Sequence, residues 1–219
     1  MTQAPAVAGI DVGADKKLCN LVILRGTSVV ASLVRVAPEE VPAICRGHGV
    51  LVVAVDAPSR WRAGEPARQA ERDMARAGVS SFSTPTQAQA ERSESGFFDW
   101  MFFGMRVYAA LAHDYPVLAT PRHVGGQVCI ETFPHAITCA LLGIEVASAK
   151  LKSVQRKALL DTLKIDTSVL KSVDARDATL CAVAAQFLLR GKTRTYGDAA
   201  GGYIHVPDHK AKRAPTLAP

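Results

Sequence analysis

The sequence predicts an α/β fold in which helices cover a mixed β-sheet. Three β-rich runs follow one another near the N-terminus with only short turns between them, which is typical of an antiparallel meander. A later run is continuously apolar, as expected for a central strand that is covered on both faces. The remaining β-rich runs alternate with segments of helical periodicity, so we expect helices against the sheet.

The elements are predicted from these patterns in chain order. Proline and acidic residues open the first helix, whereas Gly143 and the Arg190-Gly191-Lys192 segment end two later ones. The fourth strand is expected beside the first, at the centre of the sheet. The predicted strands are residues 7–13, 18–25, 28–36, 50–55, 127–133 and 202–207. The predicted helices are residues 38–45, 66–78, 97–114, 135–142, 153–164 and 174–189.

A helical insertion is predicted within the sheet fold, over about residues 60–122. Residues 80–95 are rich in Ser, Thr, Gln and Pro, so we expect an exposed loop there. In the 97–114 helix, aromatic and methionine side chains extend beyond one stripe, which indicates burial in the core or a subunit interface. A homodimer formed through this helix is therefore one expectation.

The length and composition fit one domain. A chain of 219 residues, 48% hydrophobic and 21% charged, is long enough to build a full core. We predict a single domain over residues 1–207 and a disordered basic tail over residues 208–219. The net charge of +6 favours an anionic partner such as nucleic acid, although part of the excess lies in this tail.

The cysteines and apolar segments favour a cytoplasmic protein. The five cysteines are scattered without a paired spacing, so we expect buried reduced thiols. The N-terminus lacks the basic and apolar regions of a signal peptide. The longest apolar run is interrupted by Asp99 and Arg106 and is too short to span a bilayer, so we expect no membrane partner.

Acidic residues in apolar surroundings are the candidates for chemistry. Asp11 lies within a predicted buried strand, Asp56 follows another, and Glu131 lies in a third. Asp174 and Asp177 open the last predicted helix, where an aspartate can also serve as an N-cap. A buried carboxylate is costly unless a metal, a proton or a hydrogen-bond donor compensates it. An ordinary structural role for all these acids explains Asp11 badly.

The acids belong to short motifs whose order resembles a known family. The motifs are Gly9-Ile10-Asp11, Val55-Asp56-Ala57-Pro58, Glu131-Thr132-Phe133-Pro134-His135-Ala136, Asp174-Ala175-Arg176-Asp177-Ala178 and the closing segment 197–207. Over about residues 7–207 the chain resembles the domain of unknown function 429 family, a predicted nuclease family of RNase H-like fold. Its paired helix acids also resemble those of Holliday-junction resolvases.

This resemblance implies a metal-dependent nuclease that hydrolyses phosphodiester bonds. Its implied metal ligands are Asp11, Asp56, Glu131 and Asp177, with Asp174 as an alternative or additional acid from the helix. Two Mg²⁺ or Mn²⁺ ions roughly 4 Å apart would suit such oxygen ligands and an in-line displacement. His135 is a candidate proton shuttle or a partner of a ligand.

Several polar and basic residues are candidates for contact with DNA or RNA. Arginines spaced by four residues share a helix face, which suits either phosphate contacts or solvated pairs with Glu71 and Asp73. A lysine beside the first motif suits a phosphate or a solvated turn. The candidates for substrate binding are Lys16, Ser59, Arg60, Arg68 and Arg72.

Two other functions remain open. The first is a non-catalytic nucleic-acid-binding or assembly module with the same fold and a poor metal site, which gains support if Glu131 points away from Asp11 and Asp56. The second is an ATP-binding phosphotransferase related to actin-like kinases, because Gly9-Ile10-Asp11 followed by Gly13 resembles their phosphate hairpin. That function needs a second glycine-rich hairpin, and the residues after Asp56 contain no glycine.

Overall fold

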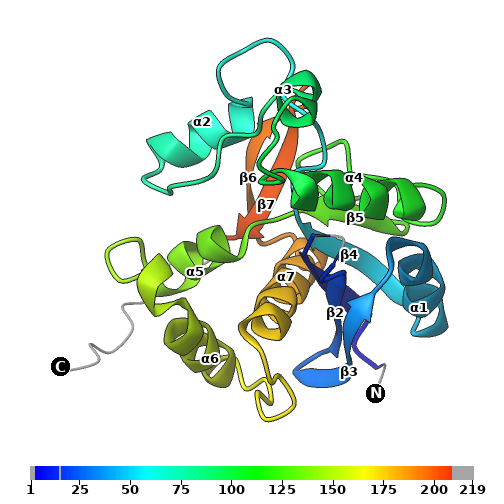
Figure 1. The fold of residues 1–219 in the computed structure, drawn as a ribbon. Coiled ribbons are helices and arrows are strands. Elements are labelled where there is room, and N and C mark those ends of the chain that lie inside the picture. Colours follow the sequence, from blue (N-terminus) through cyan, green and yellow to red (C-terminus); the bar gives the residue numbers. More distant parts are fainter. Residues whose placement is uncertain (1–2, 15, 209–219) are drawn as a thin grey trace.

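The three N-terminal strands form the predicted antiparallel meander, and its first strand continues into a parallel pairing at the sheet centre (Figure 1). The computed structural model describes residues 3–14 and 16–208. The sheet order is β3-β2-β1-β4-β5-β7-β6, in which β1, β4, β5 and β7 are parallel neighbours. The strands are β1 (Ala6–Val12), β2 (Cys19–Arg25), β3 (Ser28–Val36), β4 (Val50–Asp56), β5 (Val128–Glu131), β6 (Thr193–Asp198) and β7 (Gly202–Pro207).

Helices cover both faces of this sheet (Figure 1). Helices α1 and α4 pack on one face, and α2, α5, α6 and α7 pack on the other. This arrangement is the predicted RNase H-like α/β fold. The helices are α1 (Val41–Gly47), α2 (Gln69–Arg76), α3 (Gln87–Glu91), α4 (Asp99–Leu111), α5 (Pro134–Leu142), α6 (Lys152–Thr162) and α7 (Val173–Leu189), with short 3₁₀ turns at Pro38–Glu40 and Ala149–Leu151.

Close contact at Gly9 brings α7 onto the central strand β1. A Cβ atom at Gly9 would lie 1.9 Å from the carbonyl oxygen of Ala178 and 2.3 Å from the amide nitrogen of Ala182. No side chain fits in this space, so glycine is what allows the helix to approach the strand. The N-terminal turns of α7 consequently lie beside the C-terminal end of β1.

The aromatic helix α4 belongs to the core. Its buried residues include Phe103, Val107 and Leu111, which pack against the sheet. Gly104 allows close approach to the segment after β4, since a Cβ there would lie 2.6 Å from that of Ala57. The hydroxyl of Tyr108 donates a hydrogen bond of 2.9 Å to the carbonyl oxygen of Ala57. A homodimer through this helix stays a prediction.

Two elements differ from those predicted. Strand β6 was not expected, because it is polar and carries Gly197 in its interior; it forms an antiparallel hairpin with β7. The predicted loop at 80–95 contains the short helix α3, which Thr86 caps by accepting a hydrogen bond from the amide of Gln89. Thr86 and Gln89 form a capping box that composition alone obscured.

Other predictions concern features away from the sheet. All five cysteines are buried and unpaired, as expected. Between residues 3 and 208, leaving out residue 15, no helix is both long and apolar enough to cross a bilayer. The predicted insertion, 60–122, carries α2, α3 and α4. Apart from Asp208, the predicted tail lies outside the described residues.

Candidate functional site

Asp11 and Asp56 lie opposite each other at the C-terminal ends of the parallel strands β1 and β4. The preceding residues, Ile10 and Val55, face the core beneath α1 and α4. Because side chains alternate along a strand, both aspartates point to the other face, which α7 covers. Each is only partly exposed. Two carboxylates are therefore held side by side at the centre of the sheet.

Helix α7 adds two further acids to this face. Asp177 is buried and Asp174 is partly exposed, one turn earlier on the same helix. The N-cap is Ser172, whose hydroxyl accepts a hydrogen bond of 2.9 Å from the amide of Ala175. The alternative interpretation of Asp174 as the N-cap is therefore wrong, and its carboxylate is free for another role.

The aspartates interact electrostatically. Burial, followed by the charges of Asp177 and Asp174, raises the pKa of Asp11 from 3.8 to about 7. Burial and the charges of Asp11 and Asp177 hold the pKa of Asp56 well above its usual range. Burial raises the pKa of Asp177 to about 6, against the opposing effect of Arg156. We refer to Asp11, Asp56, Asp174 and Asp177 as the aspartate cluster.

The hydrogen-bonding capacity of this cluster is largely unused. One oxygen of Asp177, Oδ1, is buried and has no hydrogen-bond partner. Within residues 3–14 and 16–208, no group donates a hydrogen bond to the carboxylate of Asp11 or Asp56. Buried polar atoms normally have partners, so each exception needs an explanation. Among the described residues, the cluster thus keeps carboxylate oxygens that no protein group bonds.

A buried arginine from α6 currently supplies the nearest positive charge. Arg156 donates from Nη1 to Oδ2 of Asp177 at 2.6 Å, and its own Nε has no partner. Its charge lowers the pKa values of Asp11, Asp56 and Asp177 against the effect of burial. The sequence prediction missed this residue. The sequence did contain a signal that Arg156 is buried. It precedes Leu159 and Leu160 by three and four residues and therefore shares their apolar helix face.

By register, the side chain of Glu131 points away from those of Asp11 and Asp56, but it stays near Asp56: besides burial, its charge raises the pKa of Asp56, and both residues line one pocket. Glu131 pairs with Val55 across β4 and β5, and Val55 faces the core beneath α4. Arg68 binds Glu131 with both terminal nitrogens, at 2.5 and 2.9 Å. The backbone amide and hydroxyl of Ser59 donate to the same carboxylate at 2.7 and 2.8 Å. The predicted fourth metal ligand is thus fully engaged with protein groups.

Arg68 is likewise enclosed by protein. It is buried, and its Nε donates to Oε1 of Glu71 at 2.9 Å. The amide and hydroxyl of Thr84 donate to the same oxygen of Glu71. Arg68 is paired with Glu71, as the alternative interpretation has it, but it is buried and does not lie on a solvated face. Its contact with substrate stays a prediction. We refer to Ser59, Arg68, Glu71, Thr84 and Glu131 as the glutamate network.

The other predicted residues surround these two groups. His135 opens α5, and burial and the charge of Arg156 lower its pKa. Its Nε2 lies 3.7 Å from the sulfur of Cys139. Arg60 is exposed and donates to two backbone carbonyls in the β6–β7 turn. Arg72 donates to neighbouring groups around the start of α2, and Lys16 is exposed in the turn after β1.

The aspartate cluster offers carboxylate oxygens that suit a hard divalent cation, whereas those of Glu131 already accept hydrogen bonds from Arg68 and Ser59. Carboxylate oxygens are the preferred ligands of Mg²⁺ and Mn²⁺, and the unpartnered Oδ1 of Asp177 adds a donor without a competing bond. In the described part of the chain, no three His, Cys, Asp or Glu side chains are already gathered around one ion position. Binding by three of these carboxylates would therefore require their side chains to move closer together.

The sheet order and the aspartate cluster define an RNase H-like α/β protein with a carboxylate site. The family model of DUF429, described as protein of unknown function, matches residues 9–201, so the chain belongs to that family, as predicted. Among solved structures, Thermus thermophilus RuvC is similar, with a TM-score of 0.46 and 14% identity over 85% of this chain and 96% of that chain. None of the curated proteins compared with the sequence matches it.

Proposed function

We propose that the protein is a divalent-metal-dependent nuclease that hydrolyses phosphodiester bonds. The observation that carries this proposal is the aspartate cluster, in which Asp11 and Asp56 lie in register and Asp177 keeps a buried oxygen without a partner. Bound Mg²⁺ or Mn²⁺ would activate a water molecule and stabilise the leaving oxygen of the scissile phosphate. A purely structural role does not account for the carboxylate oxygens that stay unbonded in this cluster.

In this proposal the rigid sheet and α7 position the ligands. Asp11 and Asp56 come from adjacent central strands, and the close contact at Gly9 holds Asp177 and Asp174 beside them. Asp174 replaces Glu131 in the proposed ligand set. Glu131 instead anchors Ser59 and thereby the segment that follows Asp56. With Asp174 in place of Glu131, the proposed site still has four carboxylates.

The remaining residues keep subsidiary roles in the proposal. Lys16, Arg60 and Arg72 are exposed or partly exposed cations that can contact phosphate. His135 shares the neighbourhood of Arg156 and remains a candidate for proton transfer at the rim. Ser59 and Arg68 act as positioning residues. A single domain over residues 1–207 and a cytoplasmic location complete the proposal.

A non-catalytic nucleic-acid-binding or assembly module is the second candidate. It is favoured by the orientation of Glu131 and by the ion pair between Arg156 and Asp177. It does not explain why three aspartates with raised pKa values share one face, because such an arrangement destabilises the folded state. The phosphotransferase alternative has gained no supporting feature.

The test compares the wild type with Asp11→Asn during titration with Mn²⁺ and Mg²⁺. Melting temperature and cleavage of labelled DNA and RNA are followed together. We expect metal to raise the wild-type melting temperature, since a ligand at 100 times its Kd adds about 2.7 kcal/mol. Asp11→Asn should stay folded, lose this rise and lose at least about 100-fold in cleavage, since changes to the partners of metal ligands alone cost 10–100-fold.

Asp166→Asn is the matched control, because Asp166 is exposed and its carboxylate accepts a local hydrogen bond from the amide of Ser168. It removes the same charge from the exposed segment between α6 and α7, outside the cluster, and should behave as the wild type. Metal that changes neither stability nor cleavage in the wild type would reject the nuclease proposal and favour the binding module.

A further inference from the structure

An apolar pocket adjoins the aspartate cluster at Asp56. Its aromatic wall is formed by Phe82, Trp100 and Phe133, and Met74 contributes further apolar surface. The polar side chains that also line it belong mainly to the glutamate network and are bonded to one another. The pocket therefore offers flat apolar surfaces directly beside a proposed ligand of the metal.

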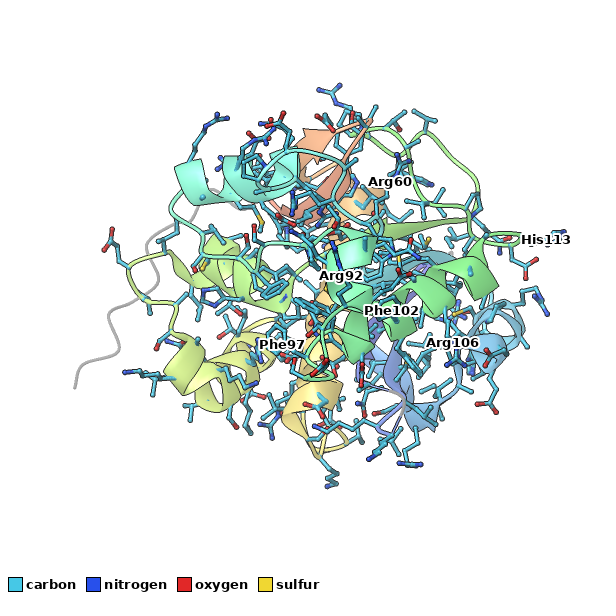
Figure 2. The ribbon with its side chains drawn as sticks, turned by 45° about the horizontal axis from the view of Figure 1, so that its top comes forward. Arg60, Arg92, Phe97, Phe102, Arg106 and His113 are labelled. Atoms are coloured by element: carbon cyan, nitrogen blue, oxygen red, sulfur yellow. The ribbon has the colours of Figure 1, made fainter. Side chains whose placement is uncertain are left out.

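Aromatic rings extend from this pocket onto the surface. Phe82 is 41% exposed and Phe97 is 57% exposed, and their ring centroids lie 5.6 Å apart. Phe98 lies 5.2 Å from Phe97, and Trp100 lies 6.1 Å from Phe82. Figure 2 shows Phe97 on the side of the molecule formed by α3 and α4. We refer to these four residues as the aromatic platform.

We propose that the aromatic platform binds unpaired nucleobases of the substrate by stacking, next to the aspartate cluster. This inference rests on the proposed nuclease function and names its substrate class. Exposed rings of phenylalanine and tryptophan stack on the π-face of any base, so recognition of this kind tolerates sequence. A base within an intact duplex is already stacked, so the platform selects single-stranded or locally unpaired nucleic acid over continuous duplex.

The surroundings of the platform suit nucleic acid better than a second copy of the chain. Phe82 and Phe97 are the only large apolar residues that are highly exposed between residues 60 and 120, and their neighbours Ser83 and Ser95 are polar and exposed. A stable dimer buries about 800 Å² on each partner, mostly around a wide apolar centre. Two exposed rings supply much less apolar surface area than this.

The exposed charges of residues 91–99 are the acids Glu91, Glu94 and Asp99 and one arginine, so recognition by the platform rests on stacking. Arg92 follows α3, is exposed, and lies on the same side of the molecule as Phe97 in Figure 2. Arg60 is also exposed, and the whole chain carries a net charge of +6. Arg92 could contact a phosphate of a strand whose bases stack on the platform.

The test measures binding without hydrolysis. Fluorescein-labelled single-stranded oligonucleotides and a blunt hairpin duplex are titrated with the full chain in EDTA, for the wild type, Phe82→Ala and Phe97→Ala. We expect the wild type to prefer the single strand. Each alanine variant should weaken single-strand binding roughly 5- to 100-fold, the range set by loss of one stacked base, and should leave duplex binding unchanged.

Two controls separate stacking from folding. Phe97→Tyr keeps an aromatic ring and should retain binding, and Val154→Ala removes an apolar side chain that is 70% exposed elsewhere on the surface. The chain has two tryptophans, so Trp61→Phe leaves Trp100 as the sole reporter. Its fluorescence should be quenched by the single strand and not by the duplex.

Equal weakening of single-strand and duplex binding, or none in either alanine variant, would overturn the proposal. The proposal would also be overturned if the wild type sediments as a dimer and Phe97→Ala sediments as a monomer. The platform would then bind a second copy of the chain. Because binding is read in EDTA, single-strand binding that depends on Phe97 without any metal-dependent cleavage would support the platform while rejecting the nuclease function.

Discussion

Two groups of acids lie at the same sheet edge, and their partners differ. In the glutamate network, Glu131 receives four hydrogen bonds from Arg68 and Ser59. In the aspartate cluster, Asp177 has one arginine partner and one bare oxygen, and Asp11 and Asp56 have raised pKa values. The carboxylate of Glu131 is thus hydrogen-bonded by protein groups, whereas the aspartate cluster keeps unbonded oxygens. This difference is the basis of the proposal that the aspartates, and not Glu131, bind a metal ion.

The largest expected effect breaks the glutamate network. Arg68→Met leaves Glu131 and Glu71 buried without their shared cation, so it should lower the free energy of unfolding by about 3–5 kcal/mol in urea denaturation. Arg72→Met on the same helix removes a partly exposed arginine and should change it by about 0.5 kcal/mol or less. Equal stability of the two variants would mean that the network is not structural.

The second prediction exchanges one acid in each group. Glu131→Gln should cost about 1–3 kcal/mol of stability, because the amide cannot accept all four hydrogen bonds, and should keep the rise in melting temperature that Mn²⁺ causes. Asp56→Asn should be at least as stable as the wild type without metal and should lose that rise. If Glu131→Gln instead loses the rise in melting temperature with Mn²⁺, Glu131 is a metal ligand, as first predicted.

The smallest effect concerns pH. Asp11 has a pKa of about 7 when folded against 3.8 ordinarily, so the folded state holds its proton more tightly than the unfolded state does. Without metal, wild-type stability should therefore fall as pH rises from about 4 to about 7, by on the order of 1–2 kcal/mol for a partly exposed group. Asp56 and Asp177 act in the same direction.

Asp11→Asn is the comparison for this measurement. When the urea midpoint is recorded between pH 4 and 8, the stability of this variant should fall less with rising pH than that of the wild type. Saturating Mn²⁺ should remove most of the pH dependence of the wild-type stability. A wild type that gains stability over this range would instead indicate that ion pairs dominate the aspartate cluster.

Much of the candidate site follows from local patterns. The apolar run around Asp11 and the one that ends before Asp56 predict strands, and the parallel pairing of these strands places the two acids together. Asp177 follows from the start of an apolar helix. Local patterns did not reveal the roles of Arg156 and Arg68, which are both buried in ion pairs. In the sequence, a buried paired arginine cannot be told from an arginine on a solvated helix face.

By itself the sequence determined the order of the apolar strands and of the longer helices and the placement of Asp11, Asp56 and Glu131 in or next to strands, because hydrophobic periodicity and glycine or proline signals act within a few residues. Only the tertiary structure decided which acids meet. The register of β5 against β4 points the side chain of Glu131 away from that of Asp56, and a shift of one residue would reverse it. Register depends on contacts between segments distant in the chain, so no local pattern contains it.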